Sequence, residues 1–224
     1  MALIELERPA DGVALLSLNR PERRNALSTE LREAGCRLLA DLASDESVRA
    51  LVVTGSGSVF CAGFDLGEFE AAVSDEAFGR RLWASSDEWH RRWLEFPVPT
   101  IAAVNGAAIA GGFDVAVMCD LRVVAETATF AHPEISFGDV VYGPLHDLVG
   151  GAVARDLCFT GRRIDGVEAN RLGLATELVP ADRVLDTALE LAARIASAPR
   201  SSLSRLKAKA TRRAATVRDD TLDL

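Results

Sequence analysis

Three short segments of this sequence combine glycine-bearing turns with acidic side chains. Residues 60–66 are FCAGFDL, residues 105–114 are NGAAIAGGFD, and residues 132–134 are HPE. Two backbone N–H groups presented by such turns can hold a carbonyl oxygen as it becomes an enolate. Acids beside them can then move protons at the neighbouring carbons. The segments therefore predict an oxyanion hole next to two carboxylates.

Each turn follows a short apolar run, residues 50–54 and residues 100–104, so we expect each turn at the end of a buried strand. A helix is expected from Gly111, and the first turn of a helix offers N–H groups with partial positive charge. Asp114 lies three residues further on, on the same helix face. Gly112 allows a substrate to approach closely because it has no side chain. The alternative interpretation is that these small residues allow tight packing of a helix on a strand.

The acidic side chain of the third segment has two interpretations. Pro133 disfavours a helix at His132 and leaves Glu134 on an extended strand end or loop. A single carboxylate there is usually solvated, and a single histidine next to a proline is more often structural than a catalytic base. His90 and His146 have no supporting spacing.

The first half of the chain predicts alternating strands and helices. Residues 3–7 and 13–18 read as two strands around an Asp-Gly turn, which predicts a β-hairpin. A serine followed by leucines at helical spacing predicts an amphipathic helix over residues 28–43. A strand is expected at residues 50–54, and residues 68–95 predict one or two helices.

The second half repeats the order strand, glycine turn and helix. The expected elements are strands at residues 100–104, 121–125 and 129–131 and helices at residues 111–118, 145–157, 165–172 and 182–197. No linker divides the chain, so an α/β core domain is expected over residues 1–197. A short basic helical segment is expected over residues 198–224.

Composition narrows the class of protein. The chain has 224 residues, of which 49% are hydrophobic and 26% charged, which is ordinary for one soluble domain. A net charge of −8 argues against a general nucleic-acid role. Apolar runs are too short to span a membrane, and the N-terminal residues do not resemble a secretory signal. We expect a cytoplasmic protein.

Cysteine and basic residues add two smaller expectations. The four cysteines form no C-x-x-C pair, so neither a disulfide framework nor a zinc site is indicated, and no metal is expected. Residues 200–213 hold six lysines or arginines and no acid. Such a run is usually a solvated face, and the alternative is contact with phosphate groups.

Six motifs in order over residues 3–200 resemble the enoyl-CoA hydratase/isomerase (crotonase) superfamily. They are Asn19-Arg20-Pro21, Asn25-Ala26-Leu27, Phe60-x-Ala62-Gly63-x-Asp65-Leu66, Asn105-Gly106 with Ala110-Gly111-Gly112, Cys119-Asp120 and Pro133-Glu134. The resemblance implies a crotonase-like spiral of ββα units with a helical C-terminal region. It also implies acyl-CoA thioester substrates, homotrimers or dimers of trimers, and a place in fatty acid metabolism. No cofactor is implied beyond the coenzyme A of the substrate.

The resemblance also assigns residue roles by position. The two oxyanion-hole N–H groups fall on Phe64 and Gly111, and the two hydratase carboxylates fall on Asp114 and Glu134. The positions of the family's CoA-binding loop are Arg24, Ala26, Ala62, Asp65 and Leu66. Backbone groups of that loop typically hold the adenine, and the Arg24 side chain is within reach of a phosphate.

One departure from the family pattern leaves the reaction open. Asp114 stands where similar hydratases usually carry Glu, and a misplacement of about 1 Å can cost around a hundredfold in rate. A hydratase with both acids is expected first. The alternatives are an enoyl-CoA isomerase in which Glu134 alone shuttles the proton, and a catalytically weak acyl-CoA-binding homologue.

Two further positions bear on these alternatives. Tyr142 occupies the place of an extra acid of dienoyl isomerases, which counts against that reaction and leaves a decarboxylase-like chemistry open. Similar proteins continue past Leu224 with helices that cover the acyl site or a neighbouring subunit. Candidates for lining the acyl site are Phe64, Phe69, Trp83, Trp89 and Trp93.

Overall fold

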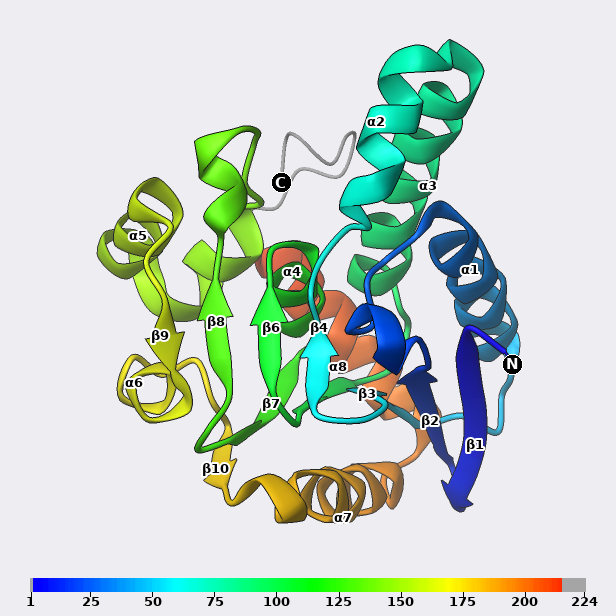
Figure 1. Cartoon of the computed structure of the whole chain (residues 1–224). Coiled ribbons are helices and arrows are strands. Elements are labelled where there is room, and N and C mark those ends of the chain that lie inside the picture. The colour runs from blue at the N-terminus through cyan, green and yellow to red at the C-terminus, as the bar shows by residue number, and fades with distance from the viewer. Residues whose placement is uncertain (1, 215–224) are drawn as a thin grey trace.

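Ten strands of the computed structural model, which describes residues 2–214, form two sheets. The larger sheet has the order β1-β2-β3-β5-β7-β10, with bounds Ile4–Ala10, Val13–Leu18, Ala50–Gly55, Thr100–Val104, Leu121–Ala125 and Glu177–Val179. The smaller sheet has the order β4-β6-β8-β9, with bounds Val59–Cys61, Ala107–Ile109, Thr129–Ala131 and Ile164–Asp165. Figure 1 shows the smaller sheet in front of α4.

The two sheets grow together as the chain winds through repeated ββα units. In the units that begin with β3, β5 and β7, the first strand joins the larger sheet and the second joins the smaller one, so β3, β5 and β7 are parallel neighbours, as are β4, β6 and β8. This arrangement is the spiral that the family resemblance implies, and the expected α/β class is confirmed. Its consequence is that the loops after β4, β6 and β8 lie side by side.

Eight α-helices and three short 3-10 helices surround the described strands. The α-helices are α1 (Thr29–Ser44), α2 (Leu66–Ser74), α3 (Glu76–Leu94), α4 (Gly111–Met118), α5 (Gly143–Thr160), α6 (Gly166–Arg171), α7 (Val184–Ala196) and α8 (Arg200–Arg213). The 3-10 helices are η1 (Pro21–Arg23), η2 (Pro133–Ser136) and η3 (Ala181–Arg183). None of the helices among the described residues is long and apolar enough to cross a membrane.

Local sequence signals explain most of these bounds. Ser28 caps α1 by accepting a hydrogen bond from Leu31 N–H. The region expected to hold one or two helices holds two, because Asp75 ends α2 and caps α3 through the N–H groups of Ala77 and Phe78. Gly150, with φ of 77°, interrupts α5.

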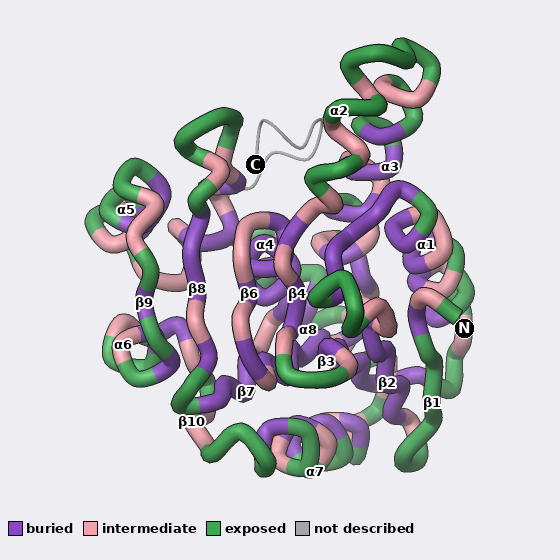
Figure 2. Tube along the Cα trace, in the orientation of Figure 1, coloured by how far each residue is buried: buried purple, intermediate pink, exposed green. Residues whose placement is uncertain are grey.

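The core lies between the sheets and helices, where β3 and β5 are buried along their whole length. Figure 2 shows β3 in the colour of buried residues. Parallel strands covered on both faces read as continuous apolar runs, as these two do. Helix α7 packs along β3, β5 and β7 at the lower edge of the view in Figure 1. All four cysteines are buried and free. Burial raises the pKa of Cys61, Cys119 and Cys158 to about 12, so these thiols stay protonated at neutral pH.

Two expectations about the turns are wrong in detail. The expected strands β3 and β5 do not lead directly into the glycine turns, because the short strands β4 and β6 intervene. Strands β4 and β6 have only three residues each, which is too few for the sequence to show the alternating pattern of a strand. Glu134 lies in the first turn of η2 rather than on an extended segment, because Pro133 is tolerated in the first turn of a helix.

The basic segment forms α8 over the residues where the positive charges cluster. The expected boundary between residues 197 and 198 stays a prediction, and residues 215–224 of the expected segment lie outside the described residues. The expectation of a wholly solvated face is wrong for Lys207, which is buried. Its ammonium group lies 2.5 Å from Asp120 Oδ2. Four other basic residues of α8 are exposed as expected, namely Arg205, Lys209, Arg212 and Arg213.

Candidate active site

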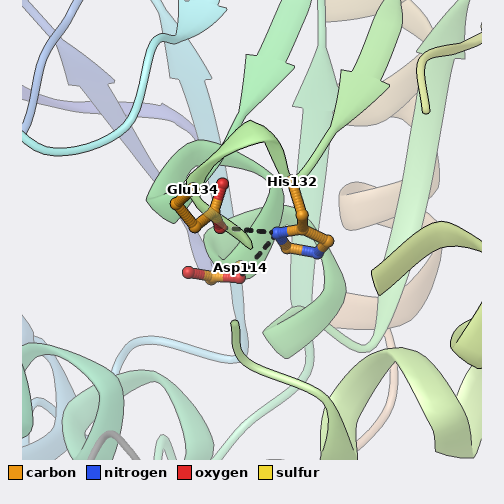
Figure 3. A group of neighbouring side chains, drawn as sticks. All are labelled: Asp114, His132 and Glu134. Carbon is orange, nitrogen blue, oxygen red and sulfur yellow. Dashed lines mark hydrogen bonds and ion pairs between the residues drawn. The ribbon is translucent and has the colours of Figure 1, made fainter. Parts of the chain in front are cut away.

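Asp114, His132 and Glu134 form one cluster of side chains (Figure 3). The ring nitrogen Nδ1 of His132 lies 2.8 Å from Glu134 Oε1 and 3.8 Å from Asp114 Oδ1. His132 is completely buried, and Asp114 is 5% exposed. Both carboxylates therefore approach the same edge of one imidazole ring.

The spiral brings these residues together from different elements. Asp114 lies in the first turn of α4, which follows β6, and Glu134 lies in η2, which follows β8. Strands β6 and β8 are parallel neighbours, so the segments after them leave the same edge of the sheet. The N–H of Ala110, the residue after β6, donates to the carbonyl of Ala131, the last residue of β8, at 2.9 Å.

The electrostatics of the cluster favour a proton on the imidazole ring. Burial lowers the pKa of His132, but the hydrogen bond to Glu134 and the charges of Asp114 and Glu134 outweigh burial, so the pKa lies above its usual value. Among the described residues, no hydrogen-bond partner reaches Asp114 Oδ1 or Glu134 Oε2. Buried carboxylate oxygens of this kind are suited to exchanging protons with a bound molecule.

The same trio is the place where the described residues could hold a metal ion. One ligand atom from each residue lies within 4.8 Å of the others. The direct hydrogen bond between His132 Nδ1 and Glu134 engages the nitrogen that faces both acids. The arrangement is therefore that of an acid–base cluster, and the absence of a required metal stays a prediction.

The two glycine turns meet beside this cluster. Gly63 has φ of 88°, and a Cβ on it would lie 2.8 Å from the carbonyl of Ile109 and 3.2 Å from Gly111 N. Ala110 has φ of 52°, a strained value for a residue with a side chain, and leads into Gly111 at the start of α4. As the first residue of the helix, Gly111 has an N–H without an acceptor inside the helix. The residues expected to form the oxyanion hole, Phe64 and Gly111, thus lie on adjoining backbone segments.

Gly112 has a different role from the one expected. A Cβ on it would lie 2.2 Å from the carbonyl oxygen of Cys61, so the space of the missing side chain is filled by β4. The alternative, tight packing of a helix on a strand, is correct for this residue. Close packing at Gly112 brings the start of α4 against the first turn.

The positions expected to bind CoA form one connected loop region. Arg24 is exposed, and its carbonyl accepts a hydrogen bond from Ala62 N–H at 3.0 Å. Arg20 donates to the carbonyl of Ala26 at 2.7 Å and to Asp65 Oδ2 at 3.0 Å. The last of these positions, Leu66, is exposed. Sequence reasoning treated Arg20 only as part of a motif and missed that it fastens this region.

The candidate aromatic residues separate into two groups. Trp89 and Trp93 belong to the buried core, so the expectation that they line the acyl site is wrong. Phe64, Phe69 and Trp83 form a partly exposed cluster, with ring centroids 6.3 Å apart for the first two and 6.1 Å for the last two. These three remain the aromatic side chains able to meet an acyl group.

His90 is a site residue that sequence reasoning missed. Its Nε2 lies 3.8 Å from Asp114 Oδ2, and its Nδ1 lies 2.8 Å from the carbonyl of Ser86. A carbonyl only accepts hydrogen bonds, so Nδ1 carries the hydrogen. No sequence signal marked this residue, because it lies on α3 and meets α4 only through tertiary packing. His146, which also had no supporting spacing in the sequence, instead lies beside Tyr142, with the ring centroids 5.4 Å apart and the ring planes tilted by 43°.

This geometry agrees with comparisons to known proteins. A family model described as enoyl-CoA hydratase/isomerase matches residues 8–223. The chain belongs to the enoyl-CoA hydratase/isomerase family. It is accordingly an enzyme of the hydratase/isomerase type. A putative enoyl-CoA hydratase of Thermus thermophilus is 40% identical over 197 residues, a match that covers 85% of this chain and 77% of the relative.

Solved structures of the family include both reaction types. The crystal structure of an enoyl-CoA hydratase from Mycobacterium smegmatis matches with a TM-score of 0.88 at 33% identity, covering 97% of this chain and 85% of that one. A monofunctional enoyl-CoA isomerase from M. smegmatis matches with a TM-score of 0.79 at 32% identity, covering 93% of this chain and 91% of that one. Family membership therefore leaves the choice between hydration and isomerisation to the site.

Proposed function

We propose that this enzyme adds water across the 2,3 double bond of an enoyl-CoA thioester. The thioester oxygen binds between the backbone N–H groups of Phe64 and Gly111 and becomes an enolate oxygen as the reaction proceeds. Asp114 takes a proton from water, whose oxygen forms a bond to C3. Glu134 gives a proton to C2, and the double bond becomes a single bond. The N–H groups stabilise charge that develops only in the transition state.

The observation that carries this proposal is the convergence of the two carboxylates on His132. Their nearest oxygens lie 2.8 and 3.8 Å from one ring nitrogen, beside the turn that starts α4. Hydration needs one group that takes a proton from the water attacking C3 and another that gives a proton to the neighbouring carbon, C2. Two acids linked by an imidazole can exchange those roles between forward and reverse reactions.

Isomerisation is the second candidate function. Glu134 would take a proton from one carbon of a 3-enoyl thioester and return it two carbons away, and Asp114 would only influence Glu134. The shorter side chain of Asp114 and the likeness to a monofunctional isomerase favour this candidate. The two reactions differ in their products, because only hydration yields a 3-hydroxyacyl thioester.

The test is the loss of conjugated enoyl absorbance when crotonyl-CoA is mixed with wild-type protein and with Glu134→Gln and Asp114→Asn. We expect steady decay with wild type and a fall of about 10²- to 10⁴-fold in kcat with either variant, the range for general acid–base groups. Glu126→Gln is the matched control, because this exposed carboxylate lies outside the cluster.

Two other results would contradict hydration. Conversion of a 3-enoyl-CoA to the conjugated isomer, unaffected by Asp114→Asn, would establish the isomerase instead. Tight thioester binding without turnover of either substrate would favour the catalytically weak homologue.

We also propose that the CoA moiety lies along Arg24, Ala26, Ala62, Asp65 and Leu66. The exposed Arg24 side chain is available to a phosphate. Assembly as a homotrimer or a dimer of trimers stays a prediction, and light scattering on the purified protein measures it.

A further inference from the structure

Arg32 is a completely buried cation that the proposed reaction does not use. It lies on α1, among residues otherwise dominated by apolar packing. Its guanidinium carbon lies 4.3 Å from the centre of the Phe64 ring, over the ring face. A guanidinium over an aromatic ring is attracted to the ring face, and this cation–π attraction is stronger when the cation is desolvated. The ring it covers belongs to the residue proposed to supply one oxyanion N–H group.

All three nitrogens of the guanidinium are held in place. Nε donates to Ser85 Oγ at 3.0 Å, and Nη2 donates to the carbonyl of Leu82 at 3.1 Å, both on α3. Nη1 donates to the carbonyl of Leu27, and the N–H of Leu27 donates to the carbonyl of Gly63 at 2.8 Å. Arg32 therefore fastens the segment that pairs with the first glycine turn.

The positive charge of Arg32 is not cancelled by direct contact. Burial lowers its pKa to about 10, so the guanidinium is still protonated at neutral pH. Glu68, Glu33 and Asp65 act on its charge through space, and two of them, Asp65 and Glu33, form ion pairs with Arg20 and Arg81 instead. Glu68 is connected only through Thr29, whose hydroxyl accepts from Nη2 at 3.3 Å and donates to Glu68 Oε2 at 2.8 Å. Among the described residues, the guanidinium charge next to the first turn is therefore offset by carboxylates at a distance and not by a direct ion pair.

The Phe64 ring, held by Arg32, also contacts the second glycine turn. A Cβ on Gly111 would lie 2.9 Å from Phe64 Cδ1 and 3.0 Å from Cε1, so the ring rests directly against the Gly111 backbone. The Arg32 guanidinium therefore lies on the Phe64 ring, and the Phe64 ring lies on the backbone of Gly111. The separation of the two turns therefore depends on a ring that Arg32 holds.

We propose that Arg32 is a positioning residue for the oxyanion hole. It fixes Phe64 against Gly111, and its buried positive charge strengthens the polarisation of a carbonyl oxygen bound between them. The inference rests on the proposed thioester function. A buried charge acts through a low dielectric and needs no rearrangement during the reaction.

The experiment measures polarisation of a bound thioester directly. Cinnamoyl-CoA absorbs at longer wavelength when its carbonyl is polarised, and a Glu134→Gln background prevents protonation of C2. We expect a clear shift to longer wavelength in that background and loss of at least half of it when Arg32→Met is added. With Glu134 intact, Arg32→Met should lower kcat by about 10- to 100-fold, less than loss of an oxyanion donor, while KM stays within about threefold.

Arg122→Met is the matched control. Arg122 is also buried, and its guanidinium donates to the carbonyls of Leu174 at 2.6 Å and Cys119 at 2.7 Å, at the opposite end of α4 from Gly111. Both substitutions should lower the Tm, but only Arg32→Met should reduce the wavelength shift. Arg32→Lys, which keeps the charge, should restore part of the shift.

Phe64→Leu covers the case in which Arg32→Met does not fold. It removes the ring and keeps the backbone N–H, so we expect a smaller wavelength shift in Phe64→Leu. Adding Arg32→Lys to Phe64→Leu should not reduce that shift further. An undiminished shift in Arg32→Met or Phe64→Leu would overturn the role of Arg32 and leave the proposed function intact. No shift in the Glu134→Gln background, together with no decay of crotonyl-CoA by wild type, would overturn both.

Discussion

Asp114 is held between two imidazole rings. His90 Nε2 lies 3.8 Å from one of its carboxylate oxygens, and His132 Nδ1 lies 3.8 Å from the other. The rings approach from α3 and from the end of β8, so the short side chain has little freedom to turn. This arrangement gives Asp114 a defined orientation at a position where similar hydratases carry the longer Glu.

The pH dependence of stability tests the linkage between His132 and the acids. Because the folded-state pKa of His132 is raised, its proton stabilises the folded protein fully below the unfolded value of about 6.5, and that contribution is lost as pH rises through the folded value. The free energy of unfolding of wild type minus that of His132→Gln should therefore decrease as pH rises from 6 to 8. Urea unfolding at a series of pH values measures the difference.

His146→Gln is the control for this comparison, because that ring lies outside the cluster. A difference between wild type and His132→Gln that grows with rising pH would contradict the raised pKa. It would mean that burial of His132, which disfavours the charged ring, outweighs the two carboxylates.

Helix α4 owes its position to the missing side chain of Gly112. The carbonyl oxygen of Cys61 on β4 occupies a point 2.2 Å from where a Cβ would be. The strained φ of Ala110 and the contact of Gly111 with the Phe64 ring occur in the preceding residues. Packing at this helix start is thus tied to the geometry of the candidate site.

Gly112→Ala should destabilise the protein and distort the site together. The added methyl group meets backbone rather than a flexible side chain, so we expect a loss of about 1–3 kcal/mol in the free energy of unfolding. We also expect a fall in kcat in the crotonyl-CoA assay. Gly67→Ala is the control, because its Cβ would lie 3.5 Å from the nearest atom, an ordinary contact on exposed helix α2. Equal stability of the two variants would contradict the close packing.

At the scale of the whole molecule, helix α8 is fastened to the core by a charged network. Asp120 Oδ2 accepts from Thr100 N–H at 2.8 Å and from the Thr100 hydroxyl at 3.0 Å, and it lies 2.5 Å from Lys207 Nζ. Arg200, the first residue of the helix, donates to the carbonyl of Val48 at 3.0 Å. These contacts join the last described helix to the beginning of β5 and to the segment just before β3.

Lys207→Met should weaken this attachment. Removing the ammonium group leaves Asp120 partly buried without its cationic partner, at a cost of about 1–3 kcal/mol. Urea unfolding should show the loss, and adding Asp120→Asn should recover part of it. Lys209→Met, on the exposed face of the same helix, should change stability little. If the two lysine variants are equally stable, the contact with Asp120 does not hold α8.

The sequence by itself determined the order of the longer elements and predicted the residues proposed to carry the chemistry of the site. Local signals act between neighbours along the chain, so the strands at residues 121–125 and 129–131 and the helix at residues 111–118 were predicted with the bounds that the structure has. The motifs also led to the family, which the comparisons confirm. Asp114 and Glu134 were proposed as the two acids before any geometry was known, because the family motifs assign that role to their positions.

Only the tertiary structure decided which residues meet. Asn25 donates to the carbonyls of Ser56 and Val59, and Asn105 donates to those of Gly55 and Gly57. These two motif residues therefore hold loops together and do not contact the acids. His90 and Arg32 reach the site from α3 and α1, and no spacing along the chain encodes either approach. The physical reason is that burial and contacts between elements depend on how the spiral packs, which local patterns do not specify.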